Sequence, residues 1–461
     1  MPGTTALPAN ATVLAANAAK KQVFWRTLIA ILTVWSLYRL HPVQNTLDEV
    51  STNGELHVIG VAGPTTFLPQ GDAARGLQYE LLREFADTLG VTLVLETAPN
   101  AETVIRKVQL GEADIGITGL ASDDPRLKPL LLSDPYLAVN QQLIQRSDDA
   151  ADSLDNPRIA VSQDSAEAVD LKGSLPDEKL IQVRNATPEK LLLQVGQGKA
   201  DLAVLNETDF AARRAAFPDL EVSGQLRRAE LAWALRRKDD KLLKAANAFL
   251  GEIADDGTLQ RLTSFYGQGK TFDTVGVRTF RHDMQARLPQ YRKAFEKEAA
   301  KLEMDWRLLA AIGYQESKWD PKATSPTGVT GLMMLTRETA SDMGVTNRGN
   351  PAQSIKAGAN YYKLIESRIP DSVREPDRTW MTLAAYNMGP GNILKARDWA
   401  AKAGDDPDKW LDVSKHLRRN PRAGQALVYV QEVRRYYDAL LMTQPNEGWF
   451  ASRDGHWRVV Y

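Results

Sequence analysis

The spacing of apolar residues changes near residue 270, and this change restricts the chain to a small set of architectures. Before it, β-prone runs alternate with amphipathic helical segments, and we expect strands at 56–61, 91–95, 115–118, 158–161 and 202–205. After it, strand-like runs almost vanish and helical spacing dominates. The first pattern favours an α/β domain and the second favours packed helices. We therefore predict a multidomain chain, α/β first and mainly α afterwards, with the boundary at 270–285.

The length of the chain agrees with this division. A chain of 461 residues exceeds what one hydrophobic core usually organises. Gly-Gln-Gly-Lys at 267–270 supplies flexible punctuation where the pattern changes. The predicted segments are a tail and export segment over 1–45, an α/β domain over 46–270, a linker over 271–284 and a helical domain over 285–461.

The N-terminus has the order of charge and hydrophobicity that is typical of an export segment. Lys20, Lys21 and Arg26 precede an apolar run over 27–38. The run is shorter than the ~20 residues that span a bilayer, and no small-x-small cleavage site follows it. A cleaved signal and a retained anchor therefore both stay open, with a buried helix of the first domain as the third alternative. We expect the chain to be exported.

The charge balance and the absence of cysteine exclude several classes of function. With 57 basic and 58 acidic residues, the net charge of −1 gives no global electrostatic reason to expect nucleic acid as a partner. Without cysteine, the chain forms no disulfide, thiolate metal site or cysteine nucleophile, and no lipid is attached to an N-terminal cysteine.

Three motifs in the first domain concern ligand binding. A glycine turn at Gly76 leads into a helix, Gly-Glu-Ala-Asp-Ile-Gly-Ile at 111–117 precedes Asp-Pro-Arg at 124–126, and Ser-Asp-Pro-Tyr follows at 133–136. Together they resemble the solute-binding proteins that take up amino acids, over roughly residues 50–270. The resemblance implies two α/β lobes that close over a ligand, with Arg126 pairing with its carboxylate. A planar guanidinium suits this task because it offers two parallel donors.

One position departs from that family. After Gly-Lys-Ala-Asp at 198–201, the family pattern places an aspartate that binds the ligand's amino group, whereas this chain has Asn206. The adjacent Glu207 need not replace it, because successive side chains on a strand point to opposite faces. A peptide or muropeptide with a carboxylate is therefore a better candidate ligand than a free amino acid, and complete loss of binding is the alternative. We expect Arg126 and Asn206 to line a regulatory ligand site whose closure acts on the second domain.

A helix in the second domain carries a glutamate that needs an explanation. Asp305 is a good N-cap, and the i, i+4, i+8 spacing places Glu316 on the same face as Leu308 and Ile312. Desolvation beside apolar side chains raises the pKa of a carboxyl group, and a carboxyl group protonated near neutral pH can protonate a leaving oxygen. Cleavage of a glycosidic bond uses this chemistry. The alternative is a glutamate that points to water at the helix end.

Three blocks in order accompany this helix. They are Glu-Ser-Lys-Trp-Asp-Pro from 316, Ser-Pro-Thr-Gly-Val-Thr-Gly-Leu-Met-Met-Leu from 325 and Ala-Ala-Tyr-Asn-Met-Gly-Pro-Gly from 384. The set resembles the catalytic domain of lytic transglycosylases related to goose-type lysozyme, over roughly 285–440. With the solute-binding-like domain and the export segment, the whole chain is similar to a membrane-bound branch of that family. The resemblance implies peptidoglycan glycan strands as substrate, an exo-acting lyase, a periplasmic location at the outer membrane, and no metal or other cofactor.

The resemblance also assigns roles by matching position. It implies that Glu316 is the catalytic acid and then base, and that the substrate is bound by Ser317, Ser325, Met334, Tyr386, Asn387 and Tyr429. Many relatives have glutamine at Met334, whereas the membrane-bound branch shows methionine. Tyr429 matches a late helical tyrosine that points toward the glutamate. For Tyr386 and Tyr429, the alternative is that they are aromatic residues of the hydrophobic core without a role in substrate binding.

One carboxylate suffices for the reaction that the resemblance implies. Glu316 protonates the leaving oxygen between N-acetylmuramic acid and N-acetylglucosamine, the N-acetyl carbonyl stabilises the developing cation, and the muramoyl 6-hydroxyl closes onto the anomeric carbon to give a 1,6-anhydro end. A hydrolytic muramidase would need a second carboxylate, for which Asp320 is the main candidate, ahead of Asp305 and Asp342. A sensor that binds glycan without cleaving it is the third alternative, and the intact Glu316-Ser317 pair argues against it.

Overall fold

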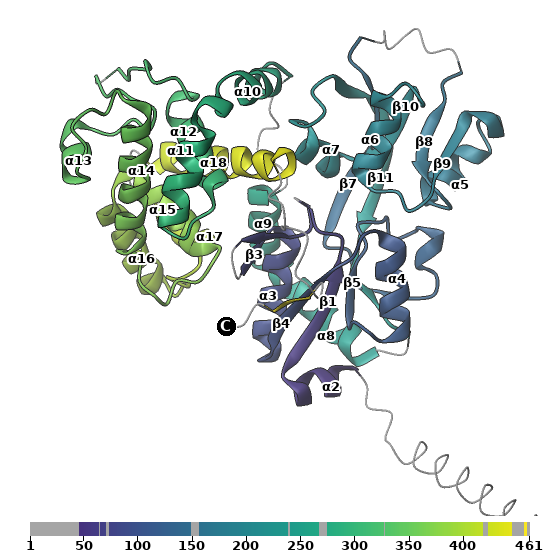
Figure 1. The fold of residues 1–461 in the computed structure, drawn as a ribbon. Coiled ribbons are helices and arrows are strands. Elements are labelled where there is room, and N and C mark those ends of the chain that lie inside the picture. The colour runs from purple at the N-terminus through teal and green to yellow at the C-terminus, as the bar shows by residue number, and fades with distance from the viewer. Residues whose placement is uncertain are drawn as a thin grey trace, which may run out of the picture.

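The computed structural model divides into an α/β unit and a helical unit (Figure 1). It describes residues 46–63, 65–70, 73–148, 156–237, 240–266, 274–326, 328–417, 423–444 and 456–458. The export segment predicted over 1–45 lies outside this set. No helix among the described residues is long and apolar enough to cross a membrane.

The first lobe of the α/β unit is a mixed sheet with the strand order β13-β4-β1-β5-β12-β6. Its strands are β1 (Glu55–Gly60), β4 (Thr92–Thr97), β5 (Ile115–Ile117), β6 (Leu131–Leu132), β12 (Ala234–Leu235) and β13 (His456–Arg458). Strand β1 runs parallel to β4 and β5, whereas β12 is antiparallel to β5. The helices of this lobe are α2 (Thr46–Asn53), α3 (Leu77–Leu89), α4 (Ala101–Leu110), α8 (Asp240–Asp255) and α9 (Thr258–Tyr266).

The second lobe is another mixed sheet, with the order β11-β7-β10-β8-β9. Its elements are β7 (Leu137–Arg146), β8 (Ile159–Ser162), β9 (Leu180–Val183), β10 (Leu202–Asn206), β11 (Leu220–Leu231), α5 (Ala166–Lys172), α6 (Pro188–Gly196) and α7 (Glu207–Arg213). The five predicted strands correspond to β1, β4, β5, β8 and β10, because each apolar run is buried in a sheet. The predicted two-lobed α/β fold is thus confirmed.

The second unit is built from helices, as predicted. They are α10 (Thr274–Ala286), α11 (Leu288–Lys301), α12 (Trp306–Ser317), α13 (Arg337–Asp342), α14 (Pro351–Glu366), α15 (Asp377–Met388), α16 (Pro390–Ala403), α17 (Trp410–Leu417) and α18 (Ala423–Thr443). Helix α18 packs along both α12 and α15. This packing brings residues from three distant parts of the sequence into one core.

The predicted linker over 271–284 is wrong for most of its length. Helix α10 begins at Thr274, and its Val277 and Phe280 are fully buried in the unit. The ring of Phe280 packs against Tyr314 and Tyr436, with centroids 4.8 and 5.2 Å away. Burial of these apolar side chains makes the segment part of the helical core rather than a free connection.

The two units share a packed and charged interface. The hairpin of β2 (Leu68–Gln70) and β3 (Ala73–Arg75) reaches the helical unit, where Leu68 joins the core and Arg75 pairs with Asp438 of α18. Arg83 of α3 pairs with Asp377 of α15 at 2.8 Å. The sheet of the first lobe also includes β13, which follows α18 in the chain and pairs with β4. Apolar packing, ion pairs and strand pairing therefore join the two units, in addition to the covalent chain between them.

Candidate active site

Helix α12 carries Glu316 in its last turn, and the sequence fixes both ends of this helix. At the start, the carboxylate of Asp305 accepts a hydrogen bond from the backbone N–H of Arg307 at 2.8 Å. At the end, Lys318 has a left-handed backbone with φ of 55°, and its N–H donates to the carbonyl of Tyr314 at 2.8 Å. The predicted helix is confirmed, and it ends immediately beyond the predicted catalytic residue.

The backbone around Glu316 is strained at three positions. Lys318, Trp319 and Met334 all have positive φ, at 55°, 55° and 47°, although none is glycine. Each such residue costs on the order of 1–2 kcal/mol, and such costs are concentrated at functional sites. Trp319 is held in place because its ring is fully buried and its indole N–H donates to the carbonyl of Ala310 at 2.8 Å.

Glu316 is partly exposed and lies beside two buried tyrosines. The hydroxyl of Tyr429 donates to Oε1 of Glu316 at 2.7 Å. Burial raises the pKa of Glu316 to about 7, and the hydrogen bond from Tyr429 acts in the opposite direction. The pKa of Tyr386 is raised mainly by burial of its hydroxyl. The negative charge of the nearby Glu316 is the second cause of this increase. The carboxyl group can therefore both give and take a proton near neutral pH.

The other predicted substrate-binding residues lie on the loop after α12 and on α15. Ser325 is partly exposed, and its hydroxyl accepts the N–H of Val329 at 3.0 Å. Met334 is partly exposed, and Asn387 at the end of α15 is exposed. The structure thus leaves these three side chains accessible, and their contact with substrate stays a prediction.

Ser317 has a structural task that the sequence did not indicate. Its side chain is buried, and its hydroxyl donates to the carbonyl of Leu332 at 2.8 Å. This bond joins α12 to the loop over 325–335. A direct contact between Ser317 and substrate stays a prediction, but the observed hydroxyl faces the protein's own backbone.

The contacts that hold Met333, next to the predicted substrate-binding residue Met334, were not predicted from the sequence. The N–H of Met333 donates to the hydroxyl of Ser354 at 3.0 Å, and its carbonyl lies 3.5 Å from the hydroxyl of Tyr386. Its side chain fills space left by Gly358, where an added Cβ would lie 2.7 Å from Met333 carbons. Met333 is thus fixed at backbone and side chain, which holds Met334 beside it. A glycine within a helical pattern was the available signal.

Of the three alternative acids, Asp305 and Asp320 have other partners and Asp342 is exposed. Asp305 caps α12, and both of its oxygens lie within 3.2 Å of the Arg307 guanidinium. Asp320 accepts the N–H of Lys322 at 2.9 Å in the turn after α12. Asp342 is exposed at the end of α13. Among the described residues, no neighbouring carboxylate contributes to the pKa shift of Glu316.

A cavity of 130 Å³ lies between the two lobes of the α/β unit, and Arg126 and Asn206 both line it. The guanidinium of Arg126 is already engaged, with Asp124 at 2.8 and 2.9 Å, Glu102 at 3.0 Å and the hydroxyl of Ser162 at 2.7 Å. Because Ser162 belongs to the second lobe, Arg126 also bridges the lobes. A ligand carboxylate would have to compete with these acids for Arg126.

Asn206 shares the cavity with an acid that sequence reasoning missed. Its amide donates to the carbonyl of Gly119 at 3.2 Å. Asp209 lines the same cavity and accepts hydrogen bonds from Thr65 at 2.9 Å and Arg213 at 3.0 Å. Glu207 instead accepts the backbone and side-chain N–H groups of Asn140, so it does not replace a ligand-binding aspartate. Asp209 lies on α7, one helical turn after Asn206. The alternation of side chains along a strand therefore could not predict that it faces the cavity.

Comparisons with known proteins match both units. Residues 43–269 match the family of bacterial extracellular solute-binding proteins, family 3, and residues 293–409 match the transglycosylase SLT domain. A curated protein of Alcanivorax borkumensis, membrane-bound lytic murein transglycosylase F, is 38% identical over 90% of this chain and 94% of its own length. The protein of that name from Ectopseudomonas mendocina is 38% identical over 95% of this chain and 96% of its own. The solved structure of holo ArgBP from T. maritima is 25% identical over 46% of this chain and 98% of its own, with a TM-score of 0.40.

Proposed function

Since this chain belongs to the membrane-bound lytic murein transglycosylase F family, we propose that it cleaves the glycan strands of peptidoglycan with Glu316 as its single acid and base. The observation that carries this proposal is the environment of the Glu316 carboxyl group, which sets its pKa and its orientation. Glu316 is partly exposed, burial raises its pKa to about 7, and Tyr429 orients it through a 2.7 Å hydrogen bond. Such a group exists in both protonation states at neutral pH.

The first chemical step uses the protonated form of Glu316. Its proton passes to the glycosidic oxygen between N-acetylmuramic acid and N-acetylglucosamine as the bond from the anomeric carbon to this oxygen breaks. The electron pair of that bond stays with the leaving oxygen. The N-acetyl carbonyl of the substrate supports the positive charge at the anomeric carbon, and Tyr429 stabilises the new carboxylate by donating a hydrogen bond from its hydroxyl.

The second step uses the carboxylate of Glu316. It takes the proton of the muramoyl 6-hydroxyl while this oxygen attacks the anomeric carbon. A 1,6-anhydro end forms, Glu316 is protonated again, and water is not consumed. This route fits a site in which no carboxylate from the described part of the chain contributes to the pKa shift of Glu316, whereas a hydrolase uses two carboxyl groups about 5–9.5 Å apart.

The α/β unit is proposed to bind a carboxylate-bearing peptide or muropeptide, with Arg126 and Asn206 at the cavity between its lobes. Asp209 and Arg213 extend this set with one charge of each sign. We further propose that the chain lies in the periplasm and associates peripherally with the outer membrane. Support for membrane association comes from relatives that are named membrane-bound. Regulation of cleavage by the bound ligand remains part of this proposal.

Product analysis tests the proposed reaction. The chain lacking residues 1–45 and its Glu316→Gln variant are each incubated with purified peptidoglycan, and soluble fragments are identified by mass spectrometry. The proposal predicts fragments with 1,6-anhydromuramoyl ends from the parent protein and none from Glu316→Gln. Fragments with reducing muramoyl ends would instead indicate a hydrolase and direct attention to Asp320. No fragments from either protein would favour a binding protein.

A further inference from the structure

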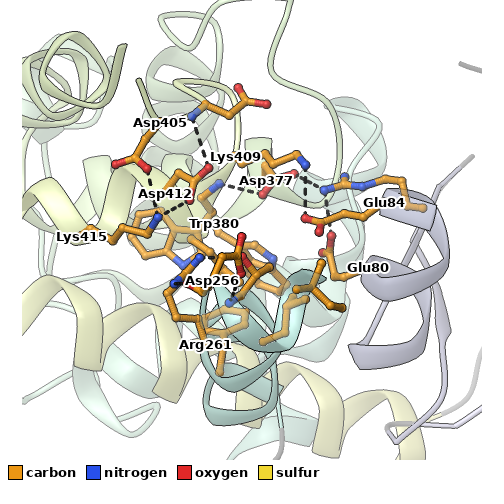
Figure 2. Close-up of a pocket in the computed structure, with 18 of the residues that line it drawn as sticks. Glu80, Glu84, Asp256, Arg261, Asp377, Trp380, Asp405, Lys409, Asp412 and Lys415 are labelled. Atoms are coloured by element: carbon orange, nitrogen blue, oxygen red, sulfur yellow. Dashed lines mark hydrogen bonds and ion pairs between the residues drawn. The ribbon is translucent and has the colours of Figure 1, made fainter. Parts of the chain in front are cut away.

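The contact between the two units has an open part and a closely packed part. The open part surrounds a cavity of 330 Å³, whose walls come from α3, α8 and α9 of the first unit and from α15, α17 and the segment before α17 in the second (Figure 2). No residue of α18 lines this cavity. The closely packed part includes α18, the helix that carries Tyr429, which reaches toward the α/β unit in Figure 1.

Arg75 of β3 enters the closely packed part from the α/β unit. Its side chain is 2% exposed, and its guanidinium forms an ion pair with Asp438 of α18. The central carbon of this guanidinium also lies 4.2 Å from the ring centroid of Tyr437, the residue before Asp438. A cation above an aromatic face is attracted to the ring. Arg75 therefore holds α18 by a charged contact and by a stacked contact.

The burial of Arg75 costs more than apolar packing would. Its Nε and Nη2 atoms are buried and, among the described residues, have no hydrogen-bond acceptor. Its partner Asp438 also accepts a hydrogen bond from Arg434 at 2.9 Å, so two buried cations share one carboxylate. An apolar side chain of similar size would avoid both costs. The best-attested use of such a buried charge is to fix a single register between packed elements.

A second contact from the α/β unit fixes the same turn of α18. Arg434 donates to the carbonyl of Phe265 on α9 at 2.9 Å, and it pairs with Asp438 one helical turn later. Arg75, Asp438 and Arg434 thus form a bridge that includes both β3 and α9 of the first unit. The rotation of α18 and its position along its own axis are therefore set at this turn by the α/β unit.

The same helix carries the hydrogen-bond partner of the predicted catalytic residue. Helix α18 is continuous from Ala423 to Thr443, and Tyr429 lies on it nine residues before Asp438. A helix rises 1.5 Å per residue, so a shift or rotation at Asp438 acts on Tyr429 over only about 13 Å. The Tyr429 hydroxyl lies 2.7 Å from Oε1 of Glu316. Hydrogen bonds between oxygens extend to about 3.0 Å, so a displacement of about 1 Å is enough to break this one.

We propose that Arg75 is a positioning residue for the reaction, because through α18 it holds the hydroxyl of Tyr429 at the carboxyl group of Glu316. The inference rests on the catalytic role proposed above for Glu316. Tyr429 touches that carboxyl group directly, whereas Arg75 acts only through the helix. The α/β unit thereby takes part in catalysis whether or not it binds a ligand.

The kinetics of Arg75→Met in the full chain test the proposal, since this variant removes the cation and keeps a long apolar side chain. We expect kcat/KM on peptidoglycan fragments to fall by about 5- to 30-fold, because a catalytic group misplaced by about 1 Å can cost about 100-fold. The pH above which kcat/KM falls should rise, since the bond from Tyr429 lowers the pKa of Glu316. Arg75→Lys, which keeps a cation for Asp438, should recover part of the activity.

A double variant separates positioning from a general loss of stability. If Arg75 acts through Tyr429, Arg75→Met should cause no further loss of kcat/KM in the Tyr429→Phe protein. Arg83→Met is the matched control, because Arg83 is also buried between the units but pairs with Glu80 of α3 and Asp377 of α15. At a temperature where it stays folded, this control should leave the pH at which kcat/KM falls unchanged.

Crystal structures of the parent protein and of Arg75→Met measure the positioning itself. The distance from the Tyr429 hydroxyl to Oε1 of Glu316 should increase from 2.7 Å to more than about 3.5 Å. A distance that stays below about 3 Å, losses that multiply in the double variant, or an equal pH shift in Arg83→Met would overturn the proposal.

Two further outcomes are read separately. If Arg75→Met fails to fold, Arg75→Gln takes its place, because the glutamine amide still offers a donor to Asp438. If the parent protein releases no fragments, the catalytic proposal fails, and the measured distance between Tyr429 and Glu316 still decides whether Arg75 positions them.

Discussion

The hydroxyl of Tyr429 lies 2.7 Å from Oε1 of Glu316, although 113 residues separate them in the chain. Helix α18 carries Tyr429, and the packing of α18 along α12 creates this contact. Two opposing effects then set the pKa of Glu316, because burial raises it and the donated hydrogen bond lowers it. The balance leaves the group near neutrality, where a residue that acts first as acid and then as base is most effective.

Tyr429→Phe should lower kcat by about 10- to 100-fold, because hydrogen bonds to charged groups contribute about 1.5–3 kcal/mol and this one stabilises the carboxylate formed in the first step. Release of fragments from peptidoglycan measures the rate. Tyr437→Phe is the matched control, since Tyr437 also lies on α18 and donates to a carboxylate of the α12 region, that of Asp305 at 2.9 Å. Equal losses in the two variants would mean that the effect is structural.

Glu316→Gln should stabilise the protein at pH 8 and change little at pH 4. The folded-state pKa of about 7 lies above the ordinary value of 4.5, so the native carboxyl group holds its proton more tightly than the unfolded one. Ionisation therefore costs folding stability progressively as pH rises from about 4.5 to 7. We expect a gain of about 1–3 kcal/mol at pH 8, measured by denaturant unfolding. A gain that is the same at both pH values would contradict the raised pKa.

Ser354→Ala should destabilise the protein by about 1–3 kcal/mol, because the buried N–H of Met333 loses its acceptor. We also expect KM to rise, with a smaller change in kcat, since Met334 belongs to the proposed substrate-binding residues. Ser367→Ala at the end of the same helix serves as control, because its exposed hydroxyl bonds only the carbonyl of Leu364 among the described residues. An unchanged KM in Ser354→Ala would remove Met334 from the proposed site.

Arg83→Met should weaken the contact between the two units. Arg83 lies 2.8 Å from carboxylate oxygens of both Glu80 and Asp377, and all three side chains are buried. Loss of one partner from a buried pair typically costs about 3–5 kcal/mol. Calorimetric unfolding should show two separated transitions in this variant. Lys241→Met, at the exposed pair with Asp48, should leave the profile unchanged.

The loss of stability caused by Arg83→Met should depend on pH. Burial raises the pKa of Glu80 to about 7, although Arg83 opposes this shift. Without the positive charge of Arg83, the pKa of Glu80 should rise further, and the protonated form of Glu80 should be favoured more strongly. The destabilisation by Arg83→Met should therefore be smaller at pH 5 than at pH 8, and a larger effect at pH 5 would contradict this account.

The sequence predicted the elements whose apolar residues repeat with a clear period. The strands around β1 and β10, the helix α12 and the change to helical packing all follow from such patterns. Helix α10 was missed although Val277, Phe280 and Met284 have helical spacing, because glycine-rich punctuation just before it favoured a linker.

Side-chain partners were harder to predict than elements. The hydroxyl of Ser317 bonds a backbone carbonyl at Leu332, and no residue type in a sequence marks such an acceptor. The competition of Asp124 and Glu102 for Arg126 likewise depends on how loops fold back. The place of Tyr429 was predicted only through resemblance, since a tyrosine in a helix is as often part of the core.

The pH dependence of kcat/KM tests the central claim most directly, because it reports the protonation of the catalytic acid in the free enzyme. With peptidoglycan fragments well below KM, we predict that kcat/KM falls about tenfold per pH unit above about 7, as Glu316 loses its proton. In Tyr429→Phe the remaining activity should fall at a higher pH, since the bond that lowers the pKa is gone. A rate that stays constant to pH 9, or a fall at the same pH in both proteins, would contradict the assignment of Glu316 as the acid tuned by burial and Tyr429.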